Sequence, residues 1–442
     1  MVSLPFKSRI TRVNGRIGPI ASDAETVLSW RGAAGLSVVV VGAGIGGLTA
    51  ALLLSRIGAA VTVLERERQP DELGAGLLLQ PNGLAVLDGL GLTSQVASLG
   101  RRSFRADIRN ANERLLSGQT FPDLGEGFDS CVGILRQDLH RVLLAAIRTE
   151  PSIELRAGAK VCAAGPDGVV EIEPGVQLAP AEVVVGADGV GSGVRSGGNF
   201  GARVSDRRTV YVRGLVPADG SETFVEYWTS LGAFGSAPVA AGVTYFYLGG
   251  YRRGPAEAVA GHDLVSLRES WRRALPAAGA VLDRVASFDD LIISGVRSVR
   301  CRTWVDGRLV LLGDAAHAMA PNAGQGANSA MVDAVALASE LAAASSVTAG
   351  LRGYEVRRRP AVGRVQRVAD VLAVVSGLHD GPLAVGRDIA LRTANRVPGV
   401  THRQWRSAQQ EHPLAICACI RRMRRSQDEG RSGPAGATPL LP

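Results

Sequence analysis

The chain has 442 residues, of which 46% are hydrophobic and 20% are charged, and this composition is that of a globular protein with a sizeable core. The net charge of +8 arises from arginine, because Lys7 and Lys160 are the only lysines, and no basic stripe is interleaved with aromatic residues, so we expect no nucleic-acid partner. There is no run of 18 apolar residues, so we expect no stable membrane insertion, and five scattered cysteines indicate a reducing, cytoplasmic location.

Residues 1–35 show no hydrophobic periodicity, and we expect them to form an irregular N-terminal extension. Residues 36–41 (LSVVVV) form a continuous β-branched run that is typical of a buried parallel strand. An apolar helix to about Ile57 and a second strand at residues 60–64 follow, and this strand ends at Glu65. The sequence therefore predicts a complete βαβ unit.

Between the first strand and its helix, a G-x-G-x-x-G pattern spans Gly42, Gly44 and Gly47. Gly42 makes the turn, Gly44 lets the backbone approach a pyrophosphate, and Gly47 lets the helix pack against the strand. The helix start faces the anion, and Glu65, at the end of the second strand, accepts hydrogen bonds from ribose hydroxyls. Because a carboxylate repels a 2′-phosphate, the unit favours FAD or NAD over NADP.

The middle of the chain changes from α/β to antiparallel patterning. Residues 154–173 alternate and turn at residues 166–168, which predicts a hairpin, and residues 182–185 form another apolar strand before Gly186. Short alternating runs rich in Tyr, Phe, Trp and Val then predict an antiparallel sheet over residues 209–251. A helix at residues 264–274 follows.

A second glycine-rich segment, residues 307–333, again reads as strand, loop and helix. The strand ends at Gly313-Asp314, and the loop passes through Gly324-Gln325-Gly326 into a helix that starts with small side chains. A carboxylate at the tip of a buried strand can hold a ribose or polyol hydroxyl, and a helix start offers free N–H groups to negative charge. Taken alone, the segment is also compatible with an ordinary crossover. Helices over residues 327–344 and 351–377, broken near Pro360, and a disordered tail at residues 426–442 are predicted.

Three motifs in this order resemble the single-component (group A) FAD-dependent aromatic monooxygenases, the para-hydroxybenzoate hydroxylase and salicylate hydroxylase family. They are the βαβ fingerprint with Glu65, the DG motif (Gly186 to Arg195), and the GD motif (Gly313 to Asn328, with Pro321). The resemblance implies an α/β fold with a Rossmann-like FAD-binding domain, an inserted antiparallel β-sheet substrate domain and C-terminal helices. The implied divisions are an N-terminal extension (1–35), an FAD-binding domain (36–100, 130–200 and 300–345), a substrate domain (101–129 and 201–299), C-terminal helices (346–425) and a tail (426–442).

The resemblance also implies roles for single residues. Pro321 lies near the reactive carbon of the flavin, Asp188 and Arg195 brace the FAD site, and Arg213 faces the substrate. Residues implied to contact the cofactor are Gly42, Gly44, Gly46, Gly47, Glu65, Arg66, Gly76, Arg136, Asp188, Arg195, Gly313, Asp314, Gly324, Gln325, Gly326, Ala327 and Asn328.

The implied reaction uses FAD, NAD(P)H and O₂ to form a flavin C4a-hydroperoxide and to hydroxylate an aromatic or other electron-rich small molecule in secondary or aromatic metabolism. Epoxidation of an isoprenoid or polyene, and a non-catalytic FAD-binding protein, are the alternatives; a homodimer is compatible with the family.

Several candidate residues have a structural alternative. Arg213 is either a substrate contact or a surface residue on an edge strand, and Tyr227, Trp228 and Tyr245 either line the pocket or pack in the core. His317 in the GD segment is expected to be structural. The histidines show no metal-ligand spacing, so no metal site is predicted.

Overall fold

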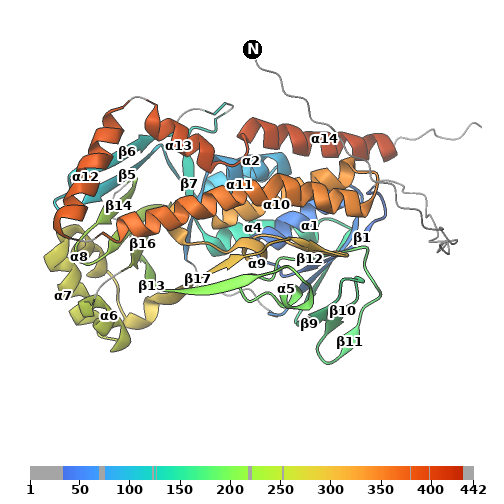
Figure 1. Cartoon of the computed structure of the whole chain (residues 1–442), viewed down its shortest axis with the longest axis horizontal. Coiled ribbons are helices and arrows are strands. Elements are labelled where there is room, and N and C mark those ends of the chain that lie inside the picture. Colours follow the sequence, from blue (N-terminus) through green and yellow to red (C-terminus); the bar gives the residue numbers. More distant parts are fainter. Residues whose placement is uncertain are drawn as a thin grey trace, which may run out of the picture. The chain divides into compact units, whose positions relative to one another are not determined.

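A computed structural model describes residues 33–68, 75–121, 124–125, 127–217, 222–250, 253–378, 380–397 and 399–431 (Figure 1). All of them belong to one compact unit of the chain, so the domain boundaries predicted from the sequence divide regions of that unit and stay a prediction. The predicted extension and tail lie largely outside the described residues. Residues 426–431, however, continue helix α14 (Pro413–Arg431), so disorder was the wrong prediction there. A helix already packed over its first turns extends at little further cost.

The first sheet has six strands in the order β18-β19-β12-β1-β2-β8, and all but β18 run parallel. The central strands are valine-rich because helices cover them and leave their side chains buried. The strands are β1 (Ser37–Val41), β2 (Ala60–Glu65), β8 (Ile153–Ala157), β12 (Val183–Gly186), β18 (Val305–Asp306) and β19 (Leu309–Leu311).

The predicted hairpin at residues 154–173 is only partly correct. A hairpin does form, but it joins β9 (Val161–Ala164) to β10 (Val170–Ile172), and β11 (Val176–Gln177) completes a small sheet. Strand β8 instead pairs with β2 in the six-stranded sheet. Alternation along a strand cannot show which distant strand offers an open edge.

Helices α1 (Ile45–Arg56) and α10 (Gly326–Ala343) pack together beside the six-stranded sheet, and α4 (Arg136–Arg148) packs on α1. A further small sheet, in the order β3-β7-β4, consists of β3 (Gly76–Leu79), β7 (Cys131–Leu135) and β4 (Arg101–Ser103). The shorter helices of this part are α2 (Pro81–Leu90), α3 (Thr93–Leu99), α5 (Gly193–Gly197), α9 (Asp314–His317) and the 3₁₀ turn η2 (Pro321–Ala323).

The predicted antiparallel region forms a seven-stranded sheet in the order β17-β13-β16-β15-β14-β5-β6. One of its faces packs on three helices, α6 (Arg253–Ala260), α7 (Leu264–Ala274) and α8 (Pro276–Leu282), around Phe234, Phe246 and Trp271. The other face carries Tyr245 and Tyr247 toward β3 and η2. The strands are β5 (Arg105–Asn110), β6 (Leu115–Thr120), β13 (Arg203–Pro217), β14 (Phe224–Trp228), β15 (Ala233–Ala240), β16 (Val243–Gly249) and β17 (Ile292–Arg300), the last preceded by η1 (Phe288–Asp290).

Helix α11 (Val347–Ser376) runs alongside α10 from the six-stranded toward the seven-stranded sheet (Figure 1). It continues through Pro360, so the predicted break there is wrong. The carbonyl that loses its partner belongs to Val356, whose side chain is 75% exposed, so water can satisfy that side of the helix. Helices α12 (Gly381–Arg396), α13 (Val400–Ala408) and α14 follow, and α14 packs on α2.

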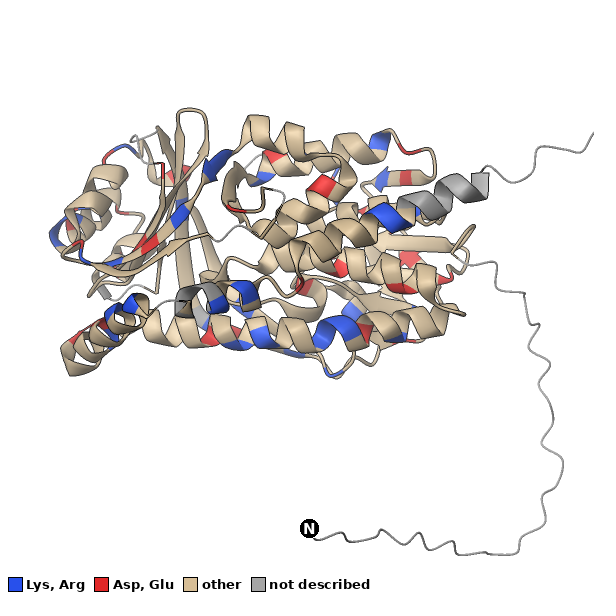
Figure 2. Ribbon diagram, turned by 90° about the horizontal axis from the view of Figure 1, so that it is seen from above, with Lys and Arg blue, Asp and Glu red and all other residues tan. Residues whose placement is uncertain are grey.

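Basic and acidic residues are interspersed over the helices, without a continuous basic stripe in the view of Figure 2. Several arginines of α11 are paired: Arg357 with Glu340 and Glu411, and Arg359 with Glu355. All five cysteines are unbridged. Among the described residues, no helix has the length and apolarity that crossing a bilayer requires.

Candidate active site

The loop between β1 and α1 has the tight geometry that its glycines predict. Gly42 has φ +100°, and a Cβ on Gly47 would lie 2.0 Å from the carbonyl oxygen of Gly42. A side chain at either position would therefore break the turn. Gly44, by contrast, faces open space, with no atom of the described chain within 4 Å of an added Cβ. The loop thus leaves room for a ligand where the pattern predicts a pyrophosphate.

Glu65 ends strand β2 beside this loop. Its Oε2 accepts a hydrogen bond from the Ala43 N–H at 2.7 Å, and Oε1 accepts from the Glu67 N–H at 3.0 Å. These bonds fix the carboxylate at the mouth of the glycine loop. Arg66, which was predicted to contact the cofactor, has a 73% exposed side chain that pairs with Glu67 at 3.2 Å, so its cofactor contact stays a prediction.

The DG motif braces the GD motif from the side. Arg195 is 9% exposed and donates from Nη1 to the Ala315 carbonyl at 2.8 Å and from Nη2 to the Val190 carbonyl at 2.7 Å. Asp188 accepts from the Gly193 N–H at 2.7 Å, whereas its buried Oδ1 has no partner among the described residues. Both residues hold backbone in place, and that orphaned oxygen is free to accept from a ligand.

The GD motif ends β19 and turns sharply into α9. Gly313 has φ +61°, and its neighbour Asp314 is exposed, with no hydrogen-bond or ion-pair partner in the part of the chain that is described. Gly324 also takes a left-handed conformation, and Gly326 faces open space. The first N–H groups of α10, at residues 326–328, lack intrahelical acceptors. The segment therefore offers one free carboxylate and a cluster of donors.

The two glycine loops are neighbours. A Cβ on Gly46, in the first turn of α1, would lie 3.0 Å from the Cβ of Ala330 on α10 and 2.9 Å from the Leu312 side chain. Asn328 of α10 donates to the Leu78 carbonyl at 3.0 Å, which brings β3 beside the second loop, and a Cβ on Gly76 of β3 would meet the Tyr245 ring. Arg136, an exposed residue, starts α4, and its N–H donates to the Ala75 carbonyl at 3.0 Å. One extended ligand can therefore contact both loops, as an FAD molecule requires.

Asn328 and Gln325 act through their side chains as structural residues. Asn328 is fully buried, accepts from the Gln80 N–H at 3.0 Å and donates to the Leu78 carbonyl at 3.0 Å. Gln325, 1% exposed, occupies the N-cap position of α10 without a side-chain capping bond, and its side chain accepts from Asn82 Nδ2 at 3.1 Å. Their backbone, rather than their side chains, remains available to a ligand.

Behind the GD motif lies a buried charge network that sequence reasoning missed. Asp333 accepts from His317 Nε2 at 2.5 Å, from Arg358 Nε at 2.8 Å and from the Gly313 N–H at 3.2 Å. Burial raises the pKa of Asp333, but the charges of His317 and Arg358 outweigh it and hold the pKa below its ordinary value. His317 thus lies in a structural network. The signal in the sequence that could have revealed this network is Asp333, the single acid in the apolar first half of α10.

The face of the seven-stranded sheet that lies toward β3 and η2 carries a row of polar residues. Arg213, Tyr247, Gly235 and Glu226 face each other across neighbouring strands. The Tyr247 ring lies over Gly235, where a Cβ would be 2.2 Å from Cζ, and its hydroxyl donates to Glu226. Arg213 donates to Ser294 Oγ at 2.6 Å. Burial raises the pKa of Glu226. This residue was not predicted from the sequence, because the alternation of side chains along one strand does not reveal which strand lies next to it.

For two of the predicted substrate residues, the structure favours the alternative of core packing. Tyr227 lies on the opposite face of the sheet, packed on the core around Phe234, so it does not line the site. Trp228 is on the site face but only 3% exposed: it donates to Glu226 and lies beneath Arg387 of α12. Alternation along β14 separates these two neighbours, whereas Tyr245 lies on the site face of β16, half-buried, with its ring beside Gly76.

A cavity of about 320 Å³ lies between the end of the sheet, η2 and α11. Its walls include Pro321, Tyr211 and mostly small residues, such as Ala233, Gly249 and Ala373. Tyr211 donates to Asn322 Oδ1 at 3.3 Å, which ties the sheet to η2. The predicted Pro321 therefore lines a space that can hold a small molecule.

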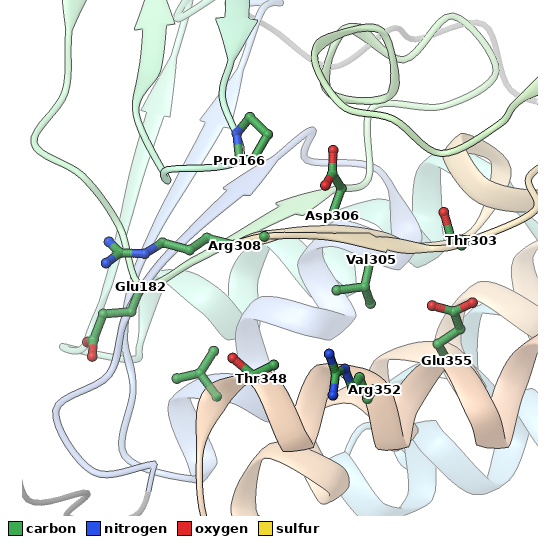
Figure 3. A pocket seen from close by; sticks show the side chains of 11 residues that line it. Pro166, Glu182, Thr303, Val305, Asp306, Arg308, Thr348, Arg352 and Glu355 are labelled. Carbon is green, nitrogen blue, oxygen red and sulfur yellow. The ribbon is translucent and has the colours of Figure 1, made fainter. Parts of the chain in front are cut away.

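A larger hollow, of about 760 Å³, lies elsewhere (Figure 3). Side chains of α11, such as Arg352 and Glu355, face Val305 and Thr303 across it, and Glu182 and Arg308 lie at one end. It contains none of the predicted site residues, whereas the smaller cavity is lined by Pro321.

Comparison with known proteins identifies the family. Residues 35–369 match the FAD binding domain family. The chain is 35% identical over 398 residues to a 3-amino-4-hydroxybenzoate 2-monooxygenase of Streptomyces cremeus, covering 84% of this chain and 94% of that protein. It is 30% identical to a putative 2-heptyl-3-hydroxy-4(1H)-quinolone synthase of Rhodococcus erythropolis, over 78% of this chain and 89% of the relative.

Among solved structures, 2-methyl-3-hydroxypyridine-5-carboxylic acid oxygenase in its tetrameric form superposes with a TM-score of 0.72 and 27% identity, covering 86% of this chain and 98% of that chain. The open glycine loops, the free carboxylate of Asp314 and the orphaned oxygen of Asp188 fit the cofactor of these enzymes. The chain belongs to the FAD binding domain family and is an FAD-dependent monooxygenase that takes its electrons from NAD(P)H.

Proposed function

We propose that the chain hydroxylates a small aromatic compound that carries an electron-donating hydroxyl or amino group and a carboxylate. The support is the similarity to an enzyme that acts on 3-amino-4-hydroxybenzoate, together with a cavity of about 320 Å³ and an arginine, Arg213, beside the Tyr211 ring that lines this cavity. A cavity of this size suits a compound of one or two rings.

Arg213 would bind the carboxylate. Its bond to Ser294 holds the guanidinium on the site face of β13, and its planar donors pair well with a carboxylate. It lies 5.5 Å from the Tyr211 ring centre, and it interacts with Tyr245, where burial raises the pKa of the phenol and the arginine opposes that rise. The tyrosines therefore stay neutral and can donate to or accept from the substrate.

The glycine loops would hold FAD, which when bound supplies activated oxygen for insertion into the ring. Glu65 would accept from the adenosine ribose, residues 42–47 would cradle the pyrophosphate, and Arg136 and Asp314 would contact the region between pyrophosphate and flavin. The free N–H groups at residues 326–328 would stabilise negative charge at the ring. Pro321 and the tyrosine-bearing face would keep water from the reacting atoms.

The observation that carries the proposal is the contact of Gly46 with Ala330, which brings the two glycine loops together. The test is to purify the protein, record its visible spectrum and screen aromatic carboxylates for faster NAD(P)H oxidation and a product heavier by one oxygen atom. Asp314→Ala should lose flavin, whereas the exposed Asp167→Ala should retain it.

Other results of this experiment would replace the proposal. If a polyene is added to the same assay, formation of its epoxide would establish the alternative substrate class. A yellow protein whose NAD(P)H oxidation no candidate accelerates would indicate a non-catalytic FAD-binding protein. Full flavin occupancy in Asp314→Ala would refute the role of that carboxylate.

We also propose a cytoplasmic homodimer. The five unbridged cysteines support a reducing compartment. Exposed apolar side chains gather on the end of α11 and on α12, including Val371, Val374, Leu383 and Ile389, and such patches often mark interfaces. Light scattering of the purified protein measures the assembly directly, and a monomer at micromolar concentration would reject it.

A further inference from the structure

The turn between α13 and α14, residues 409–411, lies against the start of α10. Gln409 is 1% exposed, and Gln410 takes φ +66°, a conformation that residues other than glycine rarely adopt. Such a conformation persists where surrounding contacts hold it. The contacts of these two glutamines explain why a turn so late in the chain returns to this place.

Gln409 joins the turn to α2. Its Oε1 accepts from the Asn82 N–H at 3.1 Å, its carbonyl accepts from Asn82 Nδ2 at 3.0 Å, and its Nε2 donates to Gln80 Oε1 at 3.2 Å. Gln80 in turn donates to the carbonyls of Ala323 and Gly324, at 3.1 Å and 3.3 Å. The turn is thus linked to the loop that precedes α10.

Gln410 reaches α10 itself. Its Nε2 donates to Gln325 Oε1 at 3.2 Å and to Ser329 Oγ at 2.6 Å, while its Oε1 accepts from Arg358 Nη2 at 2.5 Å. Arg358 is fully buried and pairs with Asp333, which accepts from the Gly313 N–H. One glutamine therefore connects the N-cap of α10 to the charge network behind the GD motif.

Gln325, at the N-cap position of α10, has hydrogen-bond partners on two sides. Gln325 is held by Gln80 and Asn82 on one side and by Gln410 on the other. The three residues that follow it carry the N–H groups without intrahelical acceptors. The orientation of these donors depends on how firmly Gln325 and the first turn are held, because misplaced donors stabilise a charge poorly.

We propose that Gln410 is a positioning residue for the flavin: from the turn between α13 and α14 it holds Gln325 and Ser329, and so fixes the direction of the first N–H groups of α10. This inference rests on the proposed role of residues 326–328 at the flavin ring. It assigns to the C-terminal helices a part in cofactor binding, although the family match ends at residue 369.

The test compares FAD binding to the apo forms of the wild type, Gln410→Gly and Gln410→Asn. Glycine relieves the positive φ and removes the side chain, whereas asparagine tolerates this φ but is one methylene too short to reach both partners. Because both variants lose the two hydrogen bonds that hold Gln325 and Ser329, besides the one from Arg358, the Kd for FAD should rise about five- to tenfold. The midpoint potential of the bound flavin should fall, because fewer aligned N–H groups then stabilise the charge of the reduced ring.

The control is Gln95→Ala, which removes an exposed glutamine of α3 and should leave the Kd and the potential unchanged. Thermal unfolding of the apo forms separates positioning from folding, since a merely structural role would lower Tm and leave the potential of the bound flavin unchanged. A Kd within twofold of the wild type in both variants, or an unchanged potential, overturns the inference while the proposed function stands. A wild type that binds no FAD overturns both.

Discussion

The buried network around Asp333 provides the sharpest test of the fold behind the site. Asp333, Arg358 and His317 are 0–1% exposed, and the carboxylate accepts three hydrogen bonds at 2.5–3.2 Å. Asp333→Asn keeps the volume of the side chain but removes its charge. The positive charge of Arg358 then loses its fully buried partner and, among the described residues, keeps only Gln410 and a 3.5 Å approach of Nη1 to Glu411.

Breaking a buried ion pair by removing one partner costs about 3–5 kcal/mol, because the remaining charge is desolvated without compensation. A chain with about 400 ordered residues has an unfolding entropy near 0.8 kcal/mol/K, so Asp333→Asn should lower the Tm of the apoprotein by about 4–6 °C at pH 7. Differential scanning fluorimetry or calorimetry measures this shift. The control is Asp167→Asn at an exposed position, which should change the free energy of unfolding by no more than about 0.5 kcal/mol and should therefore melt within 1 °C of the wild type.

The pH dependence gives the reasoning a second check. Since the folded pKa of Asp333 lies below its ordinary value, its contribution to stability is fully present above the unfolded pKa and is lost as pH falls through the folded pKa. The difference in Tm between wild type and Asp333→Asn should therefore stay constant from about pH 8 to 5 and narrow below about pH 4. In a double mutant with Arg358→Met, the loss should be smaller than the sum of the two single losses. If Asp333→Asn alone melts within 1 °C of the wild type at pH 7, the proposed cost of breaking this ion pair is refuted.

Three further predictions follow from the site. Gly47→Ala places a Cβ 2.0 Å from the Gly42 oxygen, so it should cost about 1–3 kcal/mol and weaken FAD binding at least tenfold in a titration of the apoprotein; unchanged affinity would contradict the geometry. Burial raises the folded pKa of Glu226, so the stability of the wild type should fall as pH rises from the unfolded pKa of this residue. The Tm of Glu226→Gln should therefore rise relative to that of the wild type between pH 5 and 8. A difference in Tm that does not change with pH would count against this. Tyr227→Leu should lower Tm without changing substrate KM, whereas Tyr245→Leu should raise KM about fivefold or more, and the reverse pattern would show that the faces of β14 and β16 are misassigned.

Local features of the chain were predictable because neighbouring residues alone determine them. The valine run of β1, the glycines at 42–47 and the acid at Glu65 specify strand, turn, helix and strand within one short segment, and the structure has all four. The same holds for Gly313-Asp314 and the start of α10, since turns and helix ends depend on φ angles and small side chains. Motif order along the chain was sufficient for the family and the cofactor.

Long-range pairing was decided by the tertiary structure alone. Alternation shows that Tyr227 and Trp228 point to opposite faces, but only the packing of α6–α8 and α12 decides that neither lines the open site. Pro360 stays inside α11 because contacts with α10 outweigh a local helix-breaking tendency. The links of Asp333 to Arg358 and of Gln325 to Gln410 join residues 25 and 85 positions apart, and a single sequence carries no local signal of such contacts because their energy exists only once the helices are docked.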